Sequence, residues 1–253
     1  MDGNQTPRIS VIIPALNEAG SIGPVVGSVL DKATEVIVVD NGSTDGTGAI
    51  AEKAGARVIC VQEPGYGRSC QAGVASAAKP DIIVFMDGDA ADDPADFESI
   101  VAPVHAGRAD IVIGSRLNGA VEKGALTPPQ RFGNMLACFL MRLIWNGAFT
   151  DLGPFRAIRR QSLQELDMAS LTYGWTVEMQ VRALKKGLRC VETPVRYRRR
   201  IGVSKISGTV KGVIFAGGII LGVIAREALH QPRVEPKTAH AYRNEFRKSG
   251  VKA

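Results

Sequence analysis

Two aspartates, Asp87 and Asp89, follow directly on a short apolar run and are separated by a single glycine. Carboxylates with this spacing at a strand end project their oxygens to the same side once the chain turns, and Gly88 lets the backbone approach a ligand closely. Hard oxygen ligands select Mg²⁺ or Mn²⁺, which bring substrate phosphates with them. The motif therefore predicts a metal site that handles phosphates. The alternative is a solvated acidic turn in which Asp92 or Asp93 caps the next helix.

Polar residues also follow the other apolar runs of the first half. Asp40 ends the second run and precedes the turn Asn-Gly-Ser-Thr-Asp-Gly. Its carboxylate would accept hydrogen bonds from a base or ribose. The alternative is that it is an ordinary turn residue with no ligand. Gly67 and Arg68 stand at the start of a predicted helix, where backbone N–H groups favour an anion. The chain has neither GxGxxG after the first run nor GxxxxGK[ST], which argues against a dinucleotide enzyme and a P-loop protein.

Cations gather in the second half of the sequence. The eight residues Arg198–Lys205 combine four basic side chains with Gly and Ser, a composition typical of a loop that grips phosphate, and Arg116 and Arg131 precede them. Ordinary surface charge is the alternative for each of these residues. Nucleic acid is not expected as a partner, because Tyr197 is the single aromatic residue among these basic residues, and stacking on bases needs more.

The elements that must position these residues follow from the hydrophobic pattern. Short Val- and Ile-rich runs predict strands that are buried on both faces, as in a parallel sheet, at Arg8–Pro14, Glu35–Asp40, Ala56–Val61, Asp81–Asp87 and Asp110–Gly114. Helical stretches at about 20–31, 44–54 and 67–78 separate them, which predicts a doubly wound α/β sheet. Later in the chain we expect a loop over 118–130, an apolar helix over 132–149, a turn into a strand over 151–160, a helix over 175–186 and a strand over 189–197.

Composition and charge set outer limits on the kind of protein. The 253 residues are 45% hydrophobic and 22% charged, which excludes a disordered chain and a multi-span membrane protein. No secretory signal precedes the first strand, and the four cysteines form no CxxC pair, so a reducing cytosol is expected. Residues 1–181 are net acidic and residues 182–211 strongly basic, so the first part suits a cation and the second an anion.

The segment Val213–Ala225 contains 13 uncharged residues, too few to cross a bilayer alone. It is either a buried core helix or a helix in the membrane interface. The second apolar helix at 132–149 favours the membrane. We therefore divide the chain into a catalytic domain over 8–206, an apolar and possibly interfacial helix over 207–230, and a flexible basic tail over 231–253.

Taken in order, eight motifs resemble family 2 glycosyltransferases, over about residues 8 to 215. They are IIPALNE, VVDNGSTDGT, GYGRSCQAG, MDGDAADDP, IGSR, DLGPFRAIRR, WTVEMQVRALKKGL and RRIGVSKISG. The set is most similar to the branch that contains dolichyl- and polyprenyl-phosphate mannose or glucose synthases. The resemblance implies a single Rossmann-like domain of the GT-A type with a mostly parallel sheet.

The same resemblance implies site roles. The nucleoside of a UDP- or GDP-hexose would lie against Pro14, Glu18 and Asp40, and Asp87 and Asp89 would hold a Mg²⁺ or Mn²⁺ that bridges the diphosphate. The donor and acceptor phosphates would meet Arg116, Arg131, Arg199, Ser204 and Lys205. Two positions depart from the family pattern. Leu16 stands where many members place an aromatic residue against the base, and Ala91 stands where some carry a side chain that helps to hold the metal.

These features predict an inverting, metal-dependent hexosyltransferase that acts on a polyprenyl phosphate, bound peripherally at the cytoplasmic face of a membrane. A lipid phosphate is already an anion and needs no strong base. The alternative is a hydroxyl acceptor, on a soluble metabolite or a lipid headgroup, with Asp151 or Glu178 as the catalytic base. For these two carboxylates, a turn cap and a helix-dipole partner are the structural alternatives. A non-catalytic sugar-nucleotide binder and a nucleotidyltransferase are weaker interpretations. The sequence leaves the sugar, the base and the oligomeric state open.

Overall fold

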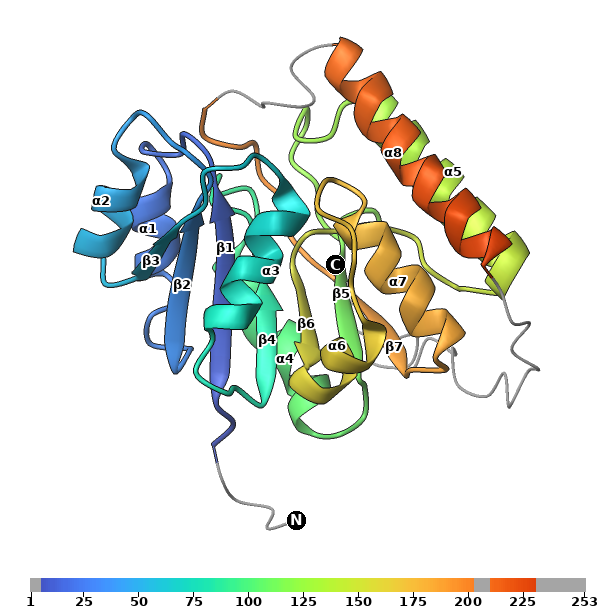
Figure 1. Cartoon of the computed structure of the whole chain (residues 1–253), viewed down its shortest axis with the longest axis horizontal. Helices are drawn as coiled ribbons and strands as arrows, with labels where there is room; N and C mark the ends of the chain where they lie inside the picture. Colours follow the sequence, from blue (N-terminus) through green and yellow to red (C-terminus); the bar gives the residue numbers. More distant parts are fainter. Residues whose placement is uncertain (1–5, 203–209, 231–253) are drawn as a thin grey trace.

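The computed structural model describes residues 6–202 and 210–230, and within them seven strands form one sheet in the order β3-β2-β1-β4-β6-β5-β7 (Figure 1). The strands are β1 Ile9–Ala15, β2 Glu35–Asp40, β3 Arg57–Cys60, β4 Ile82–Phe85, β5 Ile111–Ser115, β6 Arg156–Arg159 and β7 Cys190–Pro194. All neighbours pair in parallel except β6, which runs antiparallel to both β4 and β5. The predicted mostly parallel α/β sheet is therefore confirmed.

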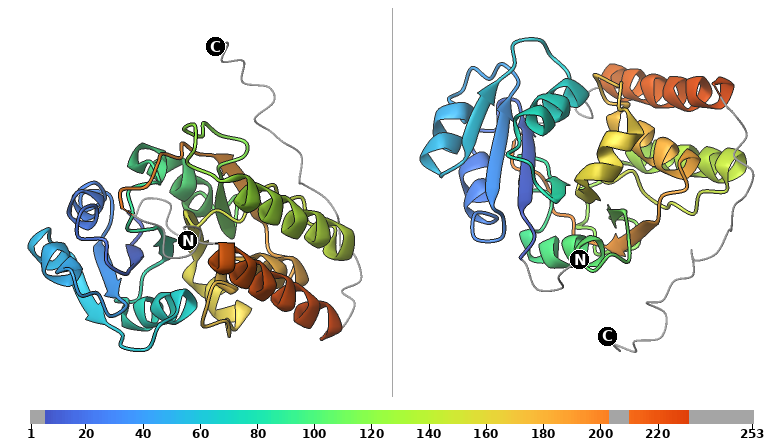
Figure 2. Two further views of the ribbon diagram at one scale, coloured as in Figure 1. Left: turned by 90° about the horizontal axis from the view of Figure 1, so that it is seen from above. Right: turned by 60° about the horizontal axis from the view of Figure 1, so that its bottom comes forward.

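Helices cover both faces of this sheet. They are α1 Ile22–Gly27, α2 Thr47–Lys53, α3 Tyr66–Ser76, α4 Phe97–His105 (preceded by the short 3₁₀ turn η1 Pro94–Asp96), α5 Pro128–Trp145, α6 Arg160–Leu166, α7 Trp175–Lys185 and α8 Val210–Leu229. Two further views show the helices on either side of the strands (Figure 2).

Alternation along the strands builds two separate cores. Val11 and Ile13 of β1 join one apolar cluster with α1, α2 and α4, whereas Ile12 joins the other with α3, α5, α6, α7 and α8. Because successive side chains of a strand point to opposite faces, continuous apolar runs are what a sheet covered on both sides requires. This explains why the first-half strands were predictable from their composition.

The strand order reverses between β1 and β4, and this reversal positions the site. Chain order runs outward from β1 through β2 to β3 on one side, and on the other side β1 pairs with β4. In open α/β sheets the crevice outside the carboxyl ends of the strands at such a switch point takes the ligand. The turns that follow Ala15, Asp40 and Phe85 all open onto this edge.

Helix α5 begins earlier than the sequence pattern indicated. Residues 118–130 were expected to be a loop, but α5 starts at Pro128, where a capping box between Thr127 and Gln130 satisfies the first turn and proline occupies N1 and N2. The pair Pro128-Pro129 therefore initiates a helix, where the prediction treated it as a breaker. The helix ends at Trp145, because Asn146 adopts the left-handed conformation at its C-cap.

Helix α8 contains the apolar segment 213–225 and lies beside α5 and α7 (Figures 1 and 2). Val223 and Ile224 are buried in the second core, so this part of α8 packs as a core helix. Within 6–202 and 210–230, no helix is both long and apolar enough to cross a membrane. The division of the chain at residues 206 and 230 stays a prediction, and the predicted tail 231–253 lies outside the described residues.

Candidate active site

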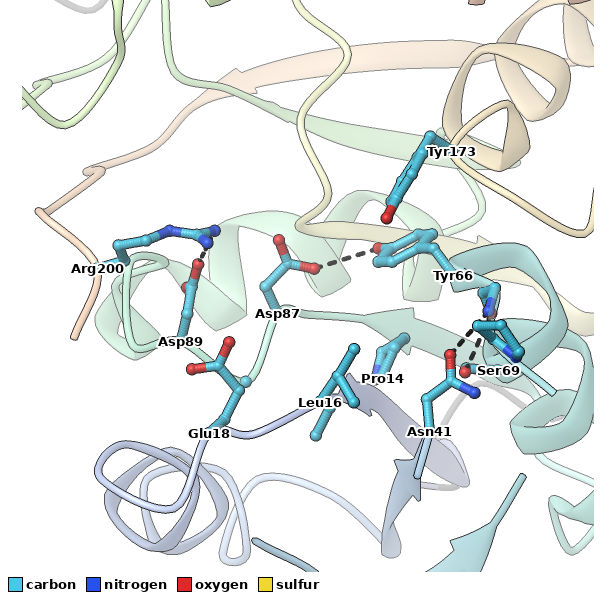
Figure 3. A pocket seen from close by; sticks show the side chains of 14 residues that line it. Pro14, Leu16, Glu18, Asn41, Tyr66, Ser69, Asp87, Asp89, Tyr173 and Arg200 are labelled. Atoms are coloured by element: carbon cyan, nitrogen blue, oxygen red, sulfur yellow. Dashed lines mark hydrogen bonds and ion pairs between the residues drawn. The ribbon is translucent and has the colours of Figure 1, made fainter. Parts of the chain in front are cut away.

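A pocket opens at the carboxyl ends of β1, β2 and β4 (Figure 3). Its walls come from the turns after these strands, from the start of α3 and from two residues that are distant in sequence. The lining residues are Pro14, Ala15, Leu16, Glu18, Asn41, Pro64, Gly65, Tyr66, Ser69, Asp87, Gly88, Asp89, Tyr173 and Arg200. A pocket at the switch point of an α/β sheet lies where such folds bind their ligand.

Three carboxylates are gathered where β4 ends. Asp87 accepts a hydrogen bond from the Tyr66 hydroxyl at 3.2 Å, and its own backbone N–H donates to Asp92 at 3.3 Å. Asp89 is buried and its carboxylate is ion-paired with Arg200. Burial, and then the negative charge of Asp89, raise the pKa of Asp87 to about 7. Burial together with the charges of Asp87 and Asp89 also raises the pKa of Asp92 well above its usual value.

The donor set fits a hard divalent cation. Among the described residues none bonds to the buried Oδ1 of Asp92, and burial together with repulsion by Asp89 disfavours ionisation of Asp87. A cation at Asp87 and Asp89 would relieve this repulsion. Among the described residues no three His, Cys, Asp or Glu side chains are grouped to bind one metal ion. A cation held by these two aspartates would complete its shell with water and phosphate oxygens.

The turn after β2 and the start of α3 form the opposite wall of the pocket. The Asn41 side chain accepts from the Gly65 backbone N–H at 2.8 Å and donates to the carbonyls of Val61 and Glu63. This amide fixes the turn that leads into α3, with φ of 153° at Gly65. Tyr66, the first residue of α3, thereby reaches Asp87 across the pocket (Figure 3).

Of the predicted nucleoside residues, three line the pocket and one lies just outside its lining. Pro14 lies near the end of β1 and Leu16 in the turn that follows it, with Glu18 close by (Figure 3). Asp40 is buried, and its Oδ1 accepts from the Ser43 backbone N–H at 2.8 Å, so this carboxylate holds the turn. Its neighbour Asn41 lines the pocket instead.

The glycines of the predicted phosphate-binding turns allow close packing. A Cβ on Gly67 would come within 2.1 Å of the Ser170 carbonyl, and the Gly67 N–H donates to the Thr172 carbonyl at 3.2 Å. The backbone N–H of Arg68 donates to Leu171 at 3.0 Å. These N–H groups are thus taken by the chain itself. The Arg68 side chain pairs with Glu63, and Gly88 lines the pocket as expected.

Asp151 is fully buried and bound to Arg116. Arg116 donates to its two oxygens from Nε at 2.9 Å and from Nη2 at 2.7 Å, and the Arg116 backbone N–H adds a third bond at 2.6 Å. Burial lowers the pKa of Arg116, but the Asp151 carboxylate reverses this, and the resulting pKa lies above the usual value. The predicted phosphate ligand and the predicted base are therefore each other's partner. Neither lines the pocket.

Glu178 is also fully buried, on α7, and four donors surround it. Oε2 accepts from the backbone N–H groups of Ala169 at 3.2 Å and Ser170 at 2.7 Å, and Oε1 lies 3.1 Å from Arg182 and 2.8 Å from Arg226. It does not line the pocket. The role of base for Asp151 or Glu178 stays a prediction.

The remaining basic residues lie toward α5. Arg199 is exposed, and its Nε donates to the Lys123 carbonyl at 2.8 Å. Its backbone N–H donates to the Glu122 carboxylate, which also forms an ion pair with the guanidinium. Arg131 is exposed in the first turn of α5. Ser204 and Lys205 lie outside the described residues. Arg199 therefore contacts the loop that leads into α5.

The site contains four side chains that sequence reasoning did not select. Arg200 pairs with Asp89, Asn41 holds the α3 turn, and Tyr66 and Tyr173 place two phenols over the acidic cluster (Figure 3). Tyr66 and Asn41 followed predicted strands, so their position carried a signal. Arg200 belongs to the basic run 198–205 that was predicted to bind phosphate, although it was not named there as a site residue, whereas nothing in the local sequence of Tyr173 indicated that it reaches the pocket.

Solved structures share this arrangement. Glucosyl-3-phosphoglycerate synthase from Mycobacterium tuberculosis in complex with phosphoglyceric acid superposes with a TM-score of 0.72 over 90% of this chain and 82% of that chain, at 22% identity. A complex of the same synthase with Mn²⁺, UDP and glucosyl-3-phosphoglycerate gives a TM-score of 0.71 over the same shares, at 21% identity. The sheet and its helices therefore have the GT-A fold of glycosyltransferases.

The family follows from the sequence comparisons. The model of glycosyl transferase family 2 matches residues 10–167, more than half of the chain. An uncharacterized glycosyltransferase of Mycobacterium tuberculosis is 36% identical over 82% of this chain and 94% of its own length. The dolichyl-phosphate hexose transferase of Haloferax volcanii is 33% identical over 85% and 90%, and the polyprenol monophosphomannose synthase of Mycolicibacterium smegmatis is 31% identical over 81% and 83%. The chain belongs to glycosyl transferase family 2 and is a glycosyltransferase, as its motifs predicted.

Proposed function

We propose that this enzyme transfers a hexose, with inversion, from a UDP- or GDP-sugar to the phosphate of a polyprenyl lipid at a membrane surface. The observation that carries the proposal is an exposed apolar stripe on α5, the helix that follows the loop to which Arg199 bonds. Two relatives of more than 30% identity act on polyprenyl or dolichyl phosphates by name, which supports the same acceptor.

The donor pocket supplies a place for the diphosphate. Asp87 and Asp89 would hold Mg²⁺ or Mn²⁺, which when bound neutralises the charge that develops on the departing nucleoside diphosphate. Arg200 neutralises Asp89. A cation at Asp89 would free the Arg200 guanidinium for the diphosphate, to which its planar fork is suited. Leu16 and the turn around Asn41 would border the nucleoside.

Neither of the two carboxylates predicted as a base, Asp151 and Glu178, lines the pocket, and this favours a phosphate acceptor. Among the described residues that line the pocket, the carboxylates are Glu18, Asp87 and Asp89, and we assign the last two to the metal. Asp151 and Glu178 are engaged by arginines and backbone N–H groups. A phosphate acceptor is already an anion near neutral pH and attacks without losing a proton to the enzyme.

The apolar stripe supplies a surface for the lipid. Phe132, Met135, Phe139 and Leu143 repeat at helical spacing along α5, and their exposed fractions are 68%, 61%, 60% and 70%. Phe215 of α8, which lies beside α5, is 64% exposed. Exposed Arg131 and Arg142 flank the stripe. Apolar side chains bordered by arginines are what an anionic membrane interface binds.

The direct test is a transfer assay. Purified protein is incubated with Mn²⁺ or Mg²⁺, a panel of labelled UDP- and GDP-hexoses, and a short polyprenyl phosphate. We expect label to enter the organic phase with one donor and to be lost in EDTA. Donor hydrolysis without lipid labelling would overturn the acceptor and favour a hydroxyl on a soluble metabolite or headgroup.

Vesicle flotation tests the membrane surface separately. The double variant Phe139→Ser/Leu143→Ser removes two exposed apolar side chains, each contributing on the order of 1 kcal/mol to interfacial binding, so binding to anionic vesicles should fall at least about tenfold. Ile50→Ser is the control, because Ile50 is an exposed apolar residue on α2, at the opposite end of the molecule (Figure 1). Equal loss in both variants, or no binding by the wild type, would contradict the proposed surface.

A further inference from the structure

We propose that Glu178 is a positioning residue that connects α8 to the donor pocket through residues 169–173, here called the Tyr173 loop. The proposal rests on the pocket being the nucleotide-sugar site. It gives the buried carboxylate a role that needs no contact with the acceptor. Three contacts in series make this connection, from α8 to Glu178, from Glu178 to the Tyr173 loop, and from the loop to the pocket.

The first link joins α8 to α7. Arg226 of α8 places Nη2 2.8 Å from Glu178 Oε1, and Arg182 of α7 adds a second guanidinium at 3.1 Å. Glu178 is fully buried, whereas the Arg226 side chain is 43% exposed. A buried carboxylate is stable only while its partners stay in place, so its geometry depends on the seat of α8.

The second link joins Glu178 to the Tyr173 loop. Its other oxygen accepts the backbone N–H groups of Ala169 and Ser170, the first two residues of the loop. Helix α8 also packs directly on the end of this loop. A Cβ on Gly174 would lie 2.6 Å from the Val223 side chain and 2.7 Å from the Ser170 hydroxyl. One helix thus holds the loop by an ion pair and by close packing.

The third link joins the loop to the donor pocket. The carbonyls of Leu171 and Thr172 accept from Arg68 and Gly67 in the first turn of α3, the helix that also presents Tyr66 to Asp87. Tyr173 itself lines the pocket, above Tyr66 and Asp87 (Figure 3). A shift of the loop would therefore move Tyr173 and the start of α3 together. Preorganised walls of this kind raise ligand affinity.

The substitution Glu178→Gln tests the central contact. All four partners of Glu178 are N–H donors, and a carboxamide offers one acceptor oxygen while turning an NH₂ group toward the other pair. Arg226→Gln breaks the same chain from α8 without touching the loop. Lys185→Gln is the matched control, because it removes another α7–α8 ion pair, Lys185–Glu227 at 2.7 Å, and leaves Glu178 intact.

The first measurement is titration of each variant with UDP and GDP in the presence of Mn²⁺, which needs no acceptor. We expect Glu178→Gln and Arg226→Gln each to weaken binding of the preferred nucleotide about tenfold, and the double variant to be no weaker than the worse single one. Lys185→Gln should bind as the wild type does. Equal affinity in all variants, or equal loss in Lys185→Gln, would overturn the proposal.

A second measurement is independent of nucleotide. Hydrogen exchange of the peptide that spans the Tyr173 loop should speed up in Glu178→Gln and Arg226→Gln and stay unchanged in Lys185→Gln. Unchanged exchange in Arg226→Gln would overturn the link to α8, whatever the titration shows. Faster exchange in a protein that binds neither nucleotide would retain the link and reject the pocket as the donor site.

Kinetics separate this role from that of a base. A positioning residue raises the donor KM in both variants, keeps most of kcat, and leaves the acidic limb of the pH profile in place. A catalytic base would lose kcat and that limb in Glu178→Gln alone, and this result would overturn the proposal. Because Glu178→Gln alters a buried group, Arg226→Gln at a half-exposed site keeps the test valid if the first variant does not fold.

Discussion

The carboxylates of the first half-sheet and those of the later half are treated differently by the fold. Around β4, Asp92 is buried beside the half-buried Asp87, and among the described residues none bonds to the Asp92 Oδ1. After β5, Asp151 is buried within a two-pronged contact from Arg116, and Glu178 is held by two arginines. A buried acid left without cations indicates a ligand, because the folded protein alone does not stabilise its charge. A buried acid with full partners indicates a structural role.

The largest effect should come from the acidic cluster. Asp87→Asn should lower hexose transfer about 10³-fold, because several kcal/mol of charge stabilisation on the leaving group are lost with the metal. The fold should be retained, since the variant removes a buried charge that Asp89 repels. The measurement is initial rate at saturating donor, with thermal melting alongside. Asp81→Asn is the control, because Asp81 lies just before the opposite end of β4 and accepts from the Arg8 backbone N–H at 2.9 Å.

The same variant has a signature in the pH dependence of stability. Asp87 has a pKa of about 7 in the folded protein against 3.8 as its ordinary value, so between these pH values the folded state binds more protons than the unfolded state. In EDTA the wild type should therefore lose stability as the pH rises from about 4 to about 7 on account of this group. Asp87→Asn should lose less across that interval. If the stability of the two proteins depended on pH in the same way, Asp87 would not be the group that causes the loss.

Variants that remove the arginine partner of a buried carboxylate should lower the free energy of unfolding. Arg116→Met leaves Asp151 buried without its cation, which should lower the free energy of unfolding by about 3–5 kcal/mol. Arg189→Met removes an equally two-pronged partner of Asp110 at the other end of β5, but Arg189 is 55% exposed there, so the cost should be no more than about 1 kcal/mol. Urea denaturation of both variants checks the difference.

A companion variant identifies the cause of that loss. Arg116→Met/Asp151→Asn should recover part of the stability, because the neutral amide no longer needs a cation. A double variant as unstable as Arg116→Met would mean that packing of the Arg116 side chain, which lies over the Tyr197 ring at 5.0 Å, matters more than its charge.

The two regions also differ in how far their sequence predicts them. The strands of the first half, and the place of Asp87 and Asp89 at the pocket, followed from apolar runs with acidic ends, because parallel strands place their carboxyl ends at one edge. Tyr173 was missed, since its segment packs beside the pocket only in the tertiary fold, and the basic run 198–205 was predicted without any sign that Arg200 would pair with Asp89. The local sequence pattern predicts which residues lie at the strand ends. It does not predict which distant loop will cover them.

The later helices show the same limit. The segment 213–225 is apolar on inspection of its sequence, yet Val223 and Ile224 face the core while the exposed stripe lies on α5. The sequence of an apolar helix does not show which of its side chains other helices will cover. It therefore could not show that the exposed stripe would lie on α5. Likewise, the spacing of Asp151 and Arg116 in sequence, 35 residues apart, gave no sign that they bind each other.

The smallest effect concerns Leu16, where the resemblance led us to expect an aromatic residue. Leu16 lines the pocket next to Pro14, on the side of the nucleoside in the proposed complex. Leu16→Tyr should strengthen nucleotide binding about threefold to tenfold, because a ring stacked on a base adds about 0.5–1.5 kcal/mol to the apolar contact. Leu16→Ala should weaken it by a similar factor, since it removes that contact. Calorimetric titration with UDP and GDP in Mn²⁺ measures both variants. A gain for one nucleotide only would identify the base that this turn accepts, whereas unchanged affinity in both variants would place the base elsewhere in the pocket.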